Sequence, residues 1–426
     1  MNFTPQGASR FYERQTFTPL PDDEEDGRFA PPEDDTTSAA AVAAPIKATP
    51  FEWCEPAKIP PREWVYGRHL IRRYVSTTVA PGGLGKSSLA LVEAVAMVSG
   101  RDLLGERPTA PLRVWYWNGE DPADELQRRV MAVALHYELR PQDIGGRLFI
   151  NSGRDTEINI AQQNRDGVII AAPVVEAIKA TIRENRIDVV IIDPFVSSHR
   201  VSENDNGAID RVAKIWARIA EETNCAVELI HHARKTNGAE VTIEDSRGAV
   251  ALLSAARSAR TLNGMTKEEA ERSGVESHRA HFRVDNGKAN LAQPLEGSTW
   301  FKMESVALGN GPPNSDGDYV GVVTPWKRPD PMANLSASDL QAAQAAVRAG
   351  GPWRENVQAR EWVGRPIAQA LKLNPDDKAD REKIRRLLRV WINNGMFVVV
   401  GGTNEKGRPT PFVEVGEAAT DGGPTL

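Results

Sequence analysis

The sequence predicts an α/β fold: a parallel β-sheet with helices on both faces, followed by a small C-terminal domain. Between residues 74 and 230, short apolar runs rich in β-branched residues alternate with runs of helical periodicity. This is the pattern of parallel strands joined by crossover helices. Near the C-terminus, three helical runs precede two strand-like runs around a polar turn. We therefore expect a core over residues 51–308, a linker over 309–335 and a second domain over 336–416.

The first 50 residues have a different composition from the rest of the chain. They combine an acidic block at residues 22–26 with prolines and an alanine-rich run, and carry nine acidic and four basic side chains. Such segments bury too little apolar surface to offset the entropy of ordering. We expect residues 1–50 to be a disordered tail that either solvates the protein or binds a partner, and residues 417–426 to be a second tail.

Composition excludes several classes of protein. Only two cysteines occur in the 426 residues, Cys54 and Cys225, too few for a disulfide framework or a cysteine-rich zinc site. No run approaches the roughly 20 apolar residues that span a membrane, and we recognise no signal peptide. We expect a cytoplasmic protein without a membrane partner. The net charge is −6, but residues 351–415 carry twelve basic and eight acidic side chains, so nucleic acid remains a candidate partner.

A glycine-rich turn lies between the first strand-like run, residues 74–79, and the helical run at 89–98. It fits the phosphate-loop motif G-x-x-x-x-G-K-[ST], with Ala80 in the first glycine position. Backbone N–H groups in such a turn face the phosphates, Lys86 reaches the terminal phosphates and the Ser87 hydroxyl holds Mg²⁺. We therefore expect ATP and Mg²⁺ as cofactors, bound by Ala80, Pro81, Gly82, Gly83, Leu84, Gly85, Lys86, Ser87 and Ser88.

The elements after this turn are assigned from periodicity and from flanking Gly and Pro residues. Strands are expected at 113–118, 147–151, 188–192 and 226–230, and helices at 124–137, 173–185 and 208–222. Two more strand-like runs, 278–284 and 300–307, are expected to extend the sheet as an antiparallel edge.

Two acidic residues at strand ends are candidates for the hydrolytic chemistry. Asp193 ends an apolar strand and suits the carboxylate that holds Mg²⁺. Glu120 follows the strand after the phosphate-loop helix and suits the group that polarises the attacking water. Its neighbour Asp121 is an alternative, although Asp121-Pro122 is typical of a helix cap. Upstream, Trp64 or Tyr66 either stacks on the adenine ring or packs against the first strand.

Four segments in this order resemble the RecA/DnaB-type ATPases, and most closely the RepA-type hexameric replicative helicases of plasmids and phages. They are A-P-G-G-L-G-K-S-S (80–88), W-N-G-E-D-P (117–122), V-I-I-D-P-F (190–195), and E-L-I-H-H-A-R-K (228–235) followed by S-R-G-A (246–249). The resemblance implies a RecA-like fold and a catalytic base at Glu120. It also implies that His231 and His232 couple the γ-phosphate to DNA, and that Arg247 reaches a neighbouring subunit's nucleotide, with Arg257 and Arg260 as alternatives.

The resemblance also implies a homo-oligomeric ring, expected to be a hexamer, with single-stranded DNA in its channel. The corresponding loops span residues 199–207 and 233–245, and offer His199, Arg200, Arg234 and Lys235 to the phosphates. Five acidic residues in the same loops leave the path of the DNA open.

The C-terminal domain has the element order of a winged helix, with helices at 336–349, 365–371 and 377–394 and strands at 396–400 and 410–415. Helical spacing places Arg381, Arg385 and Arg389 near one face of the third helix. That face either enters a groove of duplex DNA or is a solvated face of a protein-docking module.

Together these features predict an ATP-hydrolysing DNA translocase or helicase that serves replication of a phage, plasmid or mobile element. A recombination mediator that forms filaments on DNA, and an ATP-gated DNA-binding regulator, are the alternatives.

Overall fold

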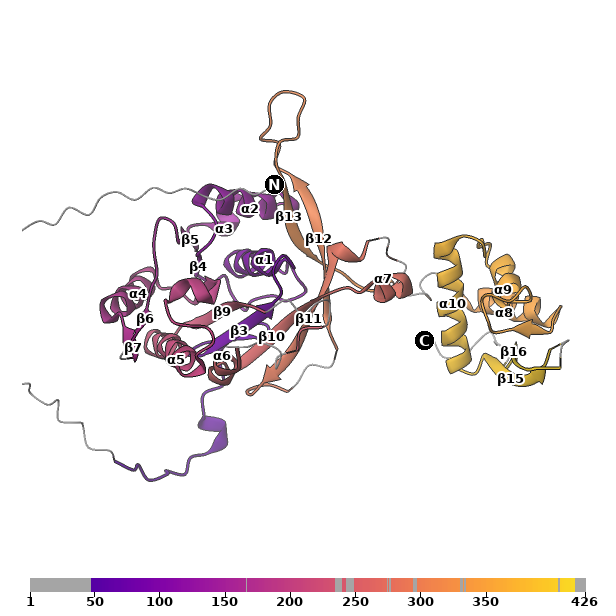
Figure 1. Ribbon diagram of the computed structural model, residues 1–426, viewed down its shortest axis with the longest axis horizontal. Coiled ribbons are helices and arrows are strands. Elements are labelled where there is room, and N and C mark those ends of the chain that lie inside the picture. Colours follow the sequence, from indigo (N-terminus) through magenta and orange to yellow (C-terminus); the bar gives the residue numbers. More distant parts are fainter. Residues whose placement is uncertain are drawn as a thin grey trace, which may run out of the picture. The chain divides into compact units, whose positions relative to one another are not determined.

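Figure 1 shows a computed structural model of the chain. The residues that it describes are 47–165, 167–233, 240–242, 249–273, 275, 277–293, 297–329, 332, 335–404 and 407–417. Residues up to Pro60 form one unit and those from Pro61 onward form another, and each is described by itself. In the first unit, the described residues form the short 3-10 helix η1 (Pro56–Lys58) and carry the exposed side chains of Phe51 and Trp53. The described helices include none long and apolar enough to cross a membrane.

The second unit contains a sheet of nine strands in the order β13-β12-β11-β10-β3-β9-β8-β4-β5. Strands β10, β3, β9, β8, β4 and β5 are parallel to one another, whereas β11, β12 and β13 continue the sheet as antiparallel neighbours. The bounds of these strands are β3 (Val75–Ala80), β4 (Val114–Asn118), β5 (Leu148–Ser152), β8 (Val189–Asp193), β9 (Ala226–His232), β10 (Ser258–Gly264), β11 (His281–Ala289), β12 (Thr299–Ala307) and β13 (Tyr319–Pro325).

Helices cover both faces of this sheet, as expected (Figure 1). Alternate residues of β8 point to opposite faces: Val189 and Ile191 join a core with α1 and α2, whereas Val190 and Ile192 join a core with α4, α5 and α6. The helices of the core are α1 (Lys86–Ser99), α2 (Ala123–His136), α3 (Pro141–Ile144), α4 (Ala172–Asn185), α5 (Asn206–Thr223), α6 (Ala249–Ala255) and α7 (Lys267–Ser273).

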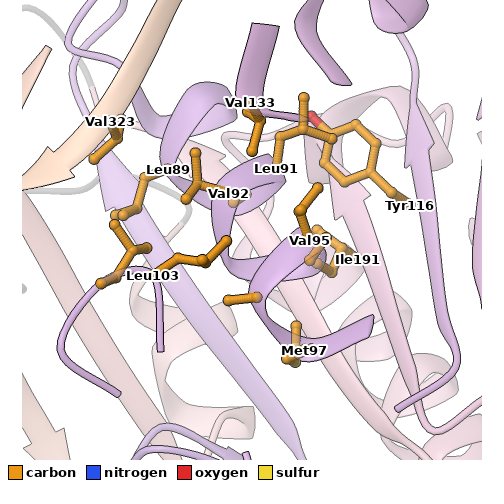
Figure 2. Close-up of a cluster of buried hydrophobic side chains, with 14 of the residues drawn as sticks. Leu89, Leu91, Val92, Val95, Met97, Leu103, Tyr116, Val133, Ile191 and Val323 are labelled. Carbon is orange, nitrogen blue, oxygen red and sulfur yellow. The ribbon is translucent and has the colours of Figure 1, made fainter. Parts of the chain in front are cut away.

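Helix α1 is buried nearly all round, which fits its almost continuous run of Leu, Ala, Val and Met. Its side chains pack between Tyr116 and Ile191 of the sheet on one side and Val133 of α2 and Val323 of β13 on the other (Figure 2). The helix begins after Gly85 and ends at Gly100, both in the left-handed conformation. The phosphate-loop helix is therefore held from several directions.

The structure corrects the linker expected over residues 309–335. Residues 319–325 are strand β13, which pairs along its whole length with β12 and buries Val322 and Val323. The Gly, Pro, Asn and Asp residues at 309–318 make the hairpin turn between β12 and β13, so their composition marks a turn inside the core. Strand β10 and the hairpin β6 (Ala161–Asn164) to β7 (Gly167–Ile170) were not expected either.

Strand β10 escaped prediction because most of its buried side chains are polar. The guanidinium of Arg260 donates two hydrogen bonds to the carboxylate of Glu93 on α1, at 2.7 and 2.6 Å, and a third to Thr78 on β3. Thr78 also donates to Glu228, which contacts His69 at 2.9 Å. Arg260 is 7% exposed, so this side chain is committed to the interior and cannot serve as the arginine that reaches a neighbouring subunit.

The C-terminal domain contains the three helices and the hairpin expected from the sequence. These are α8 (Ala337–Arg348), α9 (Gly364–Ala370), α10 (Lys378–Asn393), β15 (Phe397–Thr403) and β16 (Pro409–Val415). A further strand, β14 (Trp353–Arg354), pairs with β16 and completes a sheet of three. Trp362, Ile384, Leu387, Trp391 and Phe397 are buried in the core that these elements share.

The Arg260–Glu93 pair gives a test of the core. Replacing Arg260 by Met leaves a buried carboxylate without its partner, and we expect the free energy of unfolding to fall by about 3–5 kcal/mol. The double variant Arg260→Met/Glu93→Leu should recover part of this loss, because no unpaired charge remains. Urea unfolding of the full chain measures both effects.

The control is Lys214→Ala. Lys214 pairs with Asp210 on the exposed side of α5, and a pair of this kind contributes at most about 1 kcal/mol. An Arg260→Met variant as stable as Lys214→Ala would contradict the importance of the buried pair.

Candidate nucleotide-binding site

The phosphate loop joins β3 to α1, as expected. Gly83 and Gly85 have φ angles of 78° and 93°, which L-residues with a side chain rarely adopt. A Cβ at Gly85 would also lie 2.7 Å from Met303 Cε of β12. The backbone conformation is therefore what favours glycine at Gly85, because the flexible end of the Met303 side chain could move aside. The first turn of α1 is then left open for an anion at its N-terminus.

Lys86 begins α1 and is only 6% exposed. Its ammonium lies 2.8 Å from Nδ1 of His232, at the end of β9. Burial lowers the pKa of Lys86, while the carboxylates of Asp193 and Glu120 act in the opposite direction. A positive charge thus sits at the mouth of the loop, where a triphosphate needs it.

Asp193 ends β8 and is 1% exposed. It accepts a hydrogen bond from the hydroxyl of Tyr116 at 2.6 Å and another from Ser87. Burial raises the pKa of Asp193, and the two hydrogen bonds partly oppose this rise. A carboxylate beside a serine hydroxyl is the set of hard oxygen donors that Mg²⁺ prefers, so these two residues fit the ion.

Glu120 follows β4 and its carboxylate is more than half exposed. The turn that carries it is tightly fixed: the Gly119 N–H donates to the Asp193 carbonyl at 2.8 Å, and the Glu120 N–H donates to Asn118 Oδ1 at 3.0 Å. A Cβ at Gly119 would lie 2.3 Å from Cβ of Ser197, so only glycine fits there. The carboxylate of Glu120 is thereby directed to the pocket beside Lys86.

The alternative to Glu120 is occupied elsewhere. Asp121 forms an ion pair with Arg129 of α2 at 3.0 Å, and its backbone N–H donates to Asn118 Oδ1. Asp121 does not cap α2, however, because Pro122 directly precedes the helix and no described side chain accepts a hydrogen bond from its first turn.

The two adjacent histidines lie on opposite faces of β9, because successive residues of a strand alternate. His232 faces the phosphate loop, whereas His231 is 3% exposed and packs against Phe195, with ring centroids 6.3 Å apart. His199 also contacts the ring of Phe195, with ring centroids 4.7 Å apart. His231 and His232 therefore lie in two different environments, one in the core and the other at the phosphate loop.

His199 does not supply positive charge to the loop after β8, contrary to the sequence-based expectation. It is 5% exposed, and burial lowers the pKa of its imidazole to about 4. The loop is held against β6, because the Gln163 N–H donates to the Arg200 carbonyl at 3.1 Å and the Arg200 N–H donates to the Ala161 carbonyl at 2.7 Å. Arg200 itself is exposed and pairs with Glu157 at 2.6 Å, so its contact with DNA stays a prediction.

Several other predicted residues are only partly tested. Arg234, Lys235 and Arg247 lie outside the described residues. On α10, Arg381 donates to the carbonyls of Pro375 and Asp376, which occupies its guanidinium within the domain. Arg385 pairs with Glu382 at 2.8 Å and Arg389 is exposed. Arg257 is also exposed.

A pocket of about 700 Å³ lies beside the phosphate loop. It is lined by the loop, Glu120 and His232, and also by Arg128 of α2 and Tyr319 of β13. Tyr319 is 60% exposed. The sequence analysis did not single out Tyr319, because the run that contains it was assigned to the linker. The available signal was an aromatic residue that opens the strand-like run Tyr-Val-Gly-Val-Val after a turn rich in Gly and Asp. Tyr66 is instead buried in the core.

Comparison with known proteins agrees with this geometry. Residues 40–238 match the model of a family described as an AAA domain. One similar solved structure is described as the crystal structure of the RadB recombinase, with 16% sequence identity over 55% of this chain and 88% of that chain and a TM-score of 0.36. A likeness at that level adds nothing to the argument from the site.

The buried histidines predict a dependence of stability on pH. Burial lowers the pKa of His199 and of His231 to about 4, from about 6.5 in an unfolded chain. The unfolded state therefore binds more protons between these values, and stability is complete above pH 6.5 and is lost as the pH falls towards 4. We expect each histidine to contribute about 3 kcal/mol of this loss, measured by urea unfolding between pH 7.5 and 4.5.

The variant His199→Phe keeps an aromatic ring beside Phe195 but cannot take up a proton. Its unfolding free energy should fall less steeply below pH 6.5 than that of the wild type. Identical slopes for the two proteins would show that His199 is not the source of the effect.

Proposed function

We propose that the protein is an ATP-hydrolysing DNA translocase of the RepA-like class, acting as a helicase in phage, plasmid or mobile-element DNA replication. One observation carries this proposal: Lys86 and Ser87 of the phosphate loop and Glu120 after β4 line one pocket, and Asp193 at the end of β8 accepts a hydrogen bond from Ser87 beside it. Glu120 follows β4, which is the neighbour of β8, the strand that ends at Asp193. A carboxylate in this position distinguishes this class from other phosphate-loop proteins.

The residues divide the chemistry among them. The loop N–H groups and Lys86 bind the β- and γ-phosphates, and Ser87 and Asp193 hold Mg²⁺, which when bound neutralises charge on the phosphate oxygens. Glu120 orients the attacking water and accepts its proton. An arginine from the neighbouring subunit, Arg247 or the exposed Arg257, stabilises the charge of the transition state, an effect worth about 10³–10⁵ in rate.

The order α8, β14, α9, α10, β15, β16 supports a winged helix in the C-terminal domain. Its exposed Arg385 and Arg389 are the residues through which duplex DNA would be bound. The single-stranded DNA path in a homohexameric ring would use Arg200, Arg234 and Lys235.

A strand-displacement assay with ATP and forked DNA tests the proposal. Lys86→Ala should lose ATP binding and unwinding together. Glu120→Gln should bind ATP with nearly unchanged affinity but hydrolyse it at least about 100-fold more slowly, because the amide cannot accept the proton of water. Isothermal titration calorimetry and phosphate release separate the two effects.

Asp121→Asn is the matched control for Glu120→Gln, because it makes the same chemical change one residue away at an ion-paired carboxylate. A Glu120→Gln variant that hydrolyses ATP at the wild-type rate would refute the assignment of the base. If the wild-type protein hydrolyses ATP but unwinds no forked substrate, the proposed ATPase activity stands and the proposed helicase activity is refuted. Filaments with strand exchange would indicate the recombination mediator; binding to one duplex sequence with negligible turnover would indicate the regulator.

The exposed Tyr319 gives a separate prediction about the nucleotide base. If its ring stacks on adenine, Tyr319→Ala should weaken ATP binding by about tenfold, since stacking of a base on an aromatic side chain contributes about 1–3 kcal/mol. Tyr319→Phe keeps the ring and loses only the hydrogen bond to Asp316, so its affinity should match the wild type. Equal weakening in both variants would assign the effect to the hydroxyl instead.

A further inference from the structure

Three charged or titratable side chains from three separate elements meet in a row at the phosphate loop. His232 stands between Lys86 of α1 and Glu120 of the turn after β4, with Lys86 Nζ 2.8 Å from its Nδ1 and Glu120 Oε1 3.5 Å from its Nε2. The strand register sets this position, because His232 of β9 pairs with Ala80, the last residue of β3 before the loop. One imidazole therefore faces both the residue expected to bind phosphate and the expected base.

The hydrogen-bond chemistry fixes the state of the ring. An ammonium can only donate, so Nδ1 of His232 is an acceptor and the proton of the neutral ring is on Nε2. Burial lowers the pKa of His232, and the charge of Lys86 lowers it further. Among the described residues, Nε2 has no hydrogen-bond partner, although it faces Glu120 from just beyond the usual bonding distance.

We propose that His232 is a clasp that holds Lys86 in the nucleotide-free protein and binds Glu120 once a phosphate has taken Lys86 away. This inference rests on the proposed function of the site. His232 acts here as a positioning residue, because it works through Lys86 and Glu120. The clasp opposes every nucleotide that needs Lys86, so ADP and ATP are affected alike. A residue that only recognises the γ-phosphate would affect ATP and leave ADP unchanged.

Two substitutions separate the two contacts of the ring. In His232→Asn, the side-chain amide oxygen takes the place of Nδ1, so Lys86 keeps its acceptor but nothing reaches Glu120. In His232→Gln, the longer amide takes the place of Nε2, so the contact with Glu120 can form while the acceptor for Lys86 is lost. The control is His231→Asn, which changes the neighbouring histidine on the opposite face of β9.

The experiment is isothermal titration calorimetry of ADP and ATP with the full chain, together with steady-state ATP hydrolysis. We expect His232→Gln to bind ADP about tenfold more tightly than the wild type. We expect His232→Asn to bind ADP as the wild type does but to lower kcat about tenfold, with KM little changed. His231→Asn should leave ADP affinity unchanged. Thermal unfolding establishes that each variant is folded, and His232→Leu replaces His232→Gln if the latter is not.

Each outcome has a definite meaning. A His232→Gln variant that binds ADP no more tightly than the wild type overturns the clasp while leaving the proposed ATPase intact. A His232→Gln variant that binds ATP more weakly but ADP as the wild type does also overturns the clasp, and would indicate that His232 contacts the γ-phosphate instead. Wild-type protein that binds neither nucleotide removes the proposed function, and the clasp falls with it.

Discussion

The packing of α1 is the constraint on which the site depends. A phosphate loop works only if its strand and its helix keep a fixed relation, because the loop holds anions with backbone groups whose directions come from both ends. Here apolar side chains enclose the helix between the sheet, α2 and β13, and the buried pair Arg260–Glu93 ties it to β10. Asp193 and Glu120 are then presented by β8 and β4, the strands on which the same helix rests.

Local sequence patterns predicted the parts of the site that are encoded locally. The phosphate loop, Asp193 and Glu120 stand at the ends of apolar runs, and such runs identify strands without further information. Strand β10 could not be found in this way, because the buried Arg260 is paired with Glu93 and Thr78, residues far away in the sequence. A local sequence pattern shows that residue 260 is charged, but it does not show which distant residue pairs with that charge. The alternative role given to Arg260 failed for the same reason.

The sequence also led us to expect a single shared role for two adjacent histidines that the fold places in different surroundings. His231 and His232 were expected to act together, yet the alternation of β9 places one imidazole in the core beside Phe195 and the other beside Lys86. The loop after β8 was expected to offer His199 to phosphates. Its backbone instead joins β6, an element that was not expected, and this pairing draws the ring inside.

The hairpin formed by β12 and β13 bears on how the protein can be divided. Met303 of β12 lies beside Gly85 of the phosphate loop, and Tyr319 of β13 lines the same pocket, so these late strands complete the candidate nucleotide site. The segment that matches the AAA domain ends at residue 238, well before them. A fragment made to those limits would contain the motif but would lack five of the residues that line the pocket, namely Met303, Asp318, Tyr319, Val320 and Gly321. The shortest piece with a whole pocket has to run through Pro325.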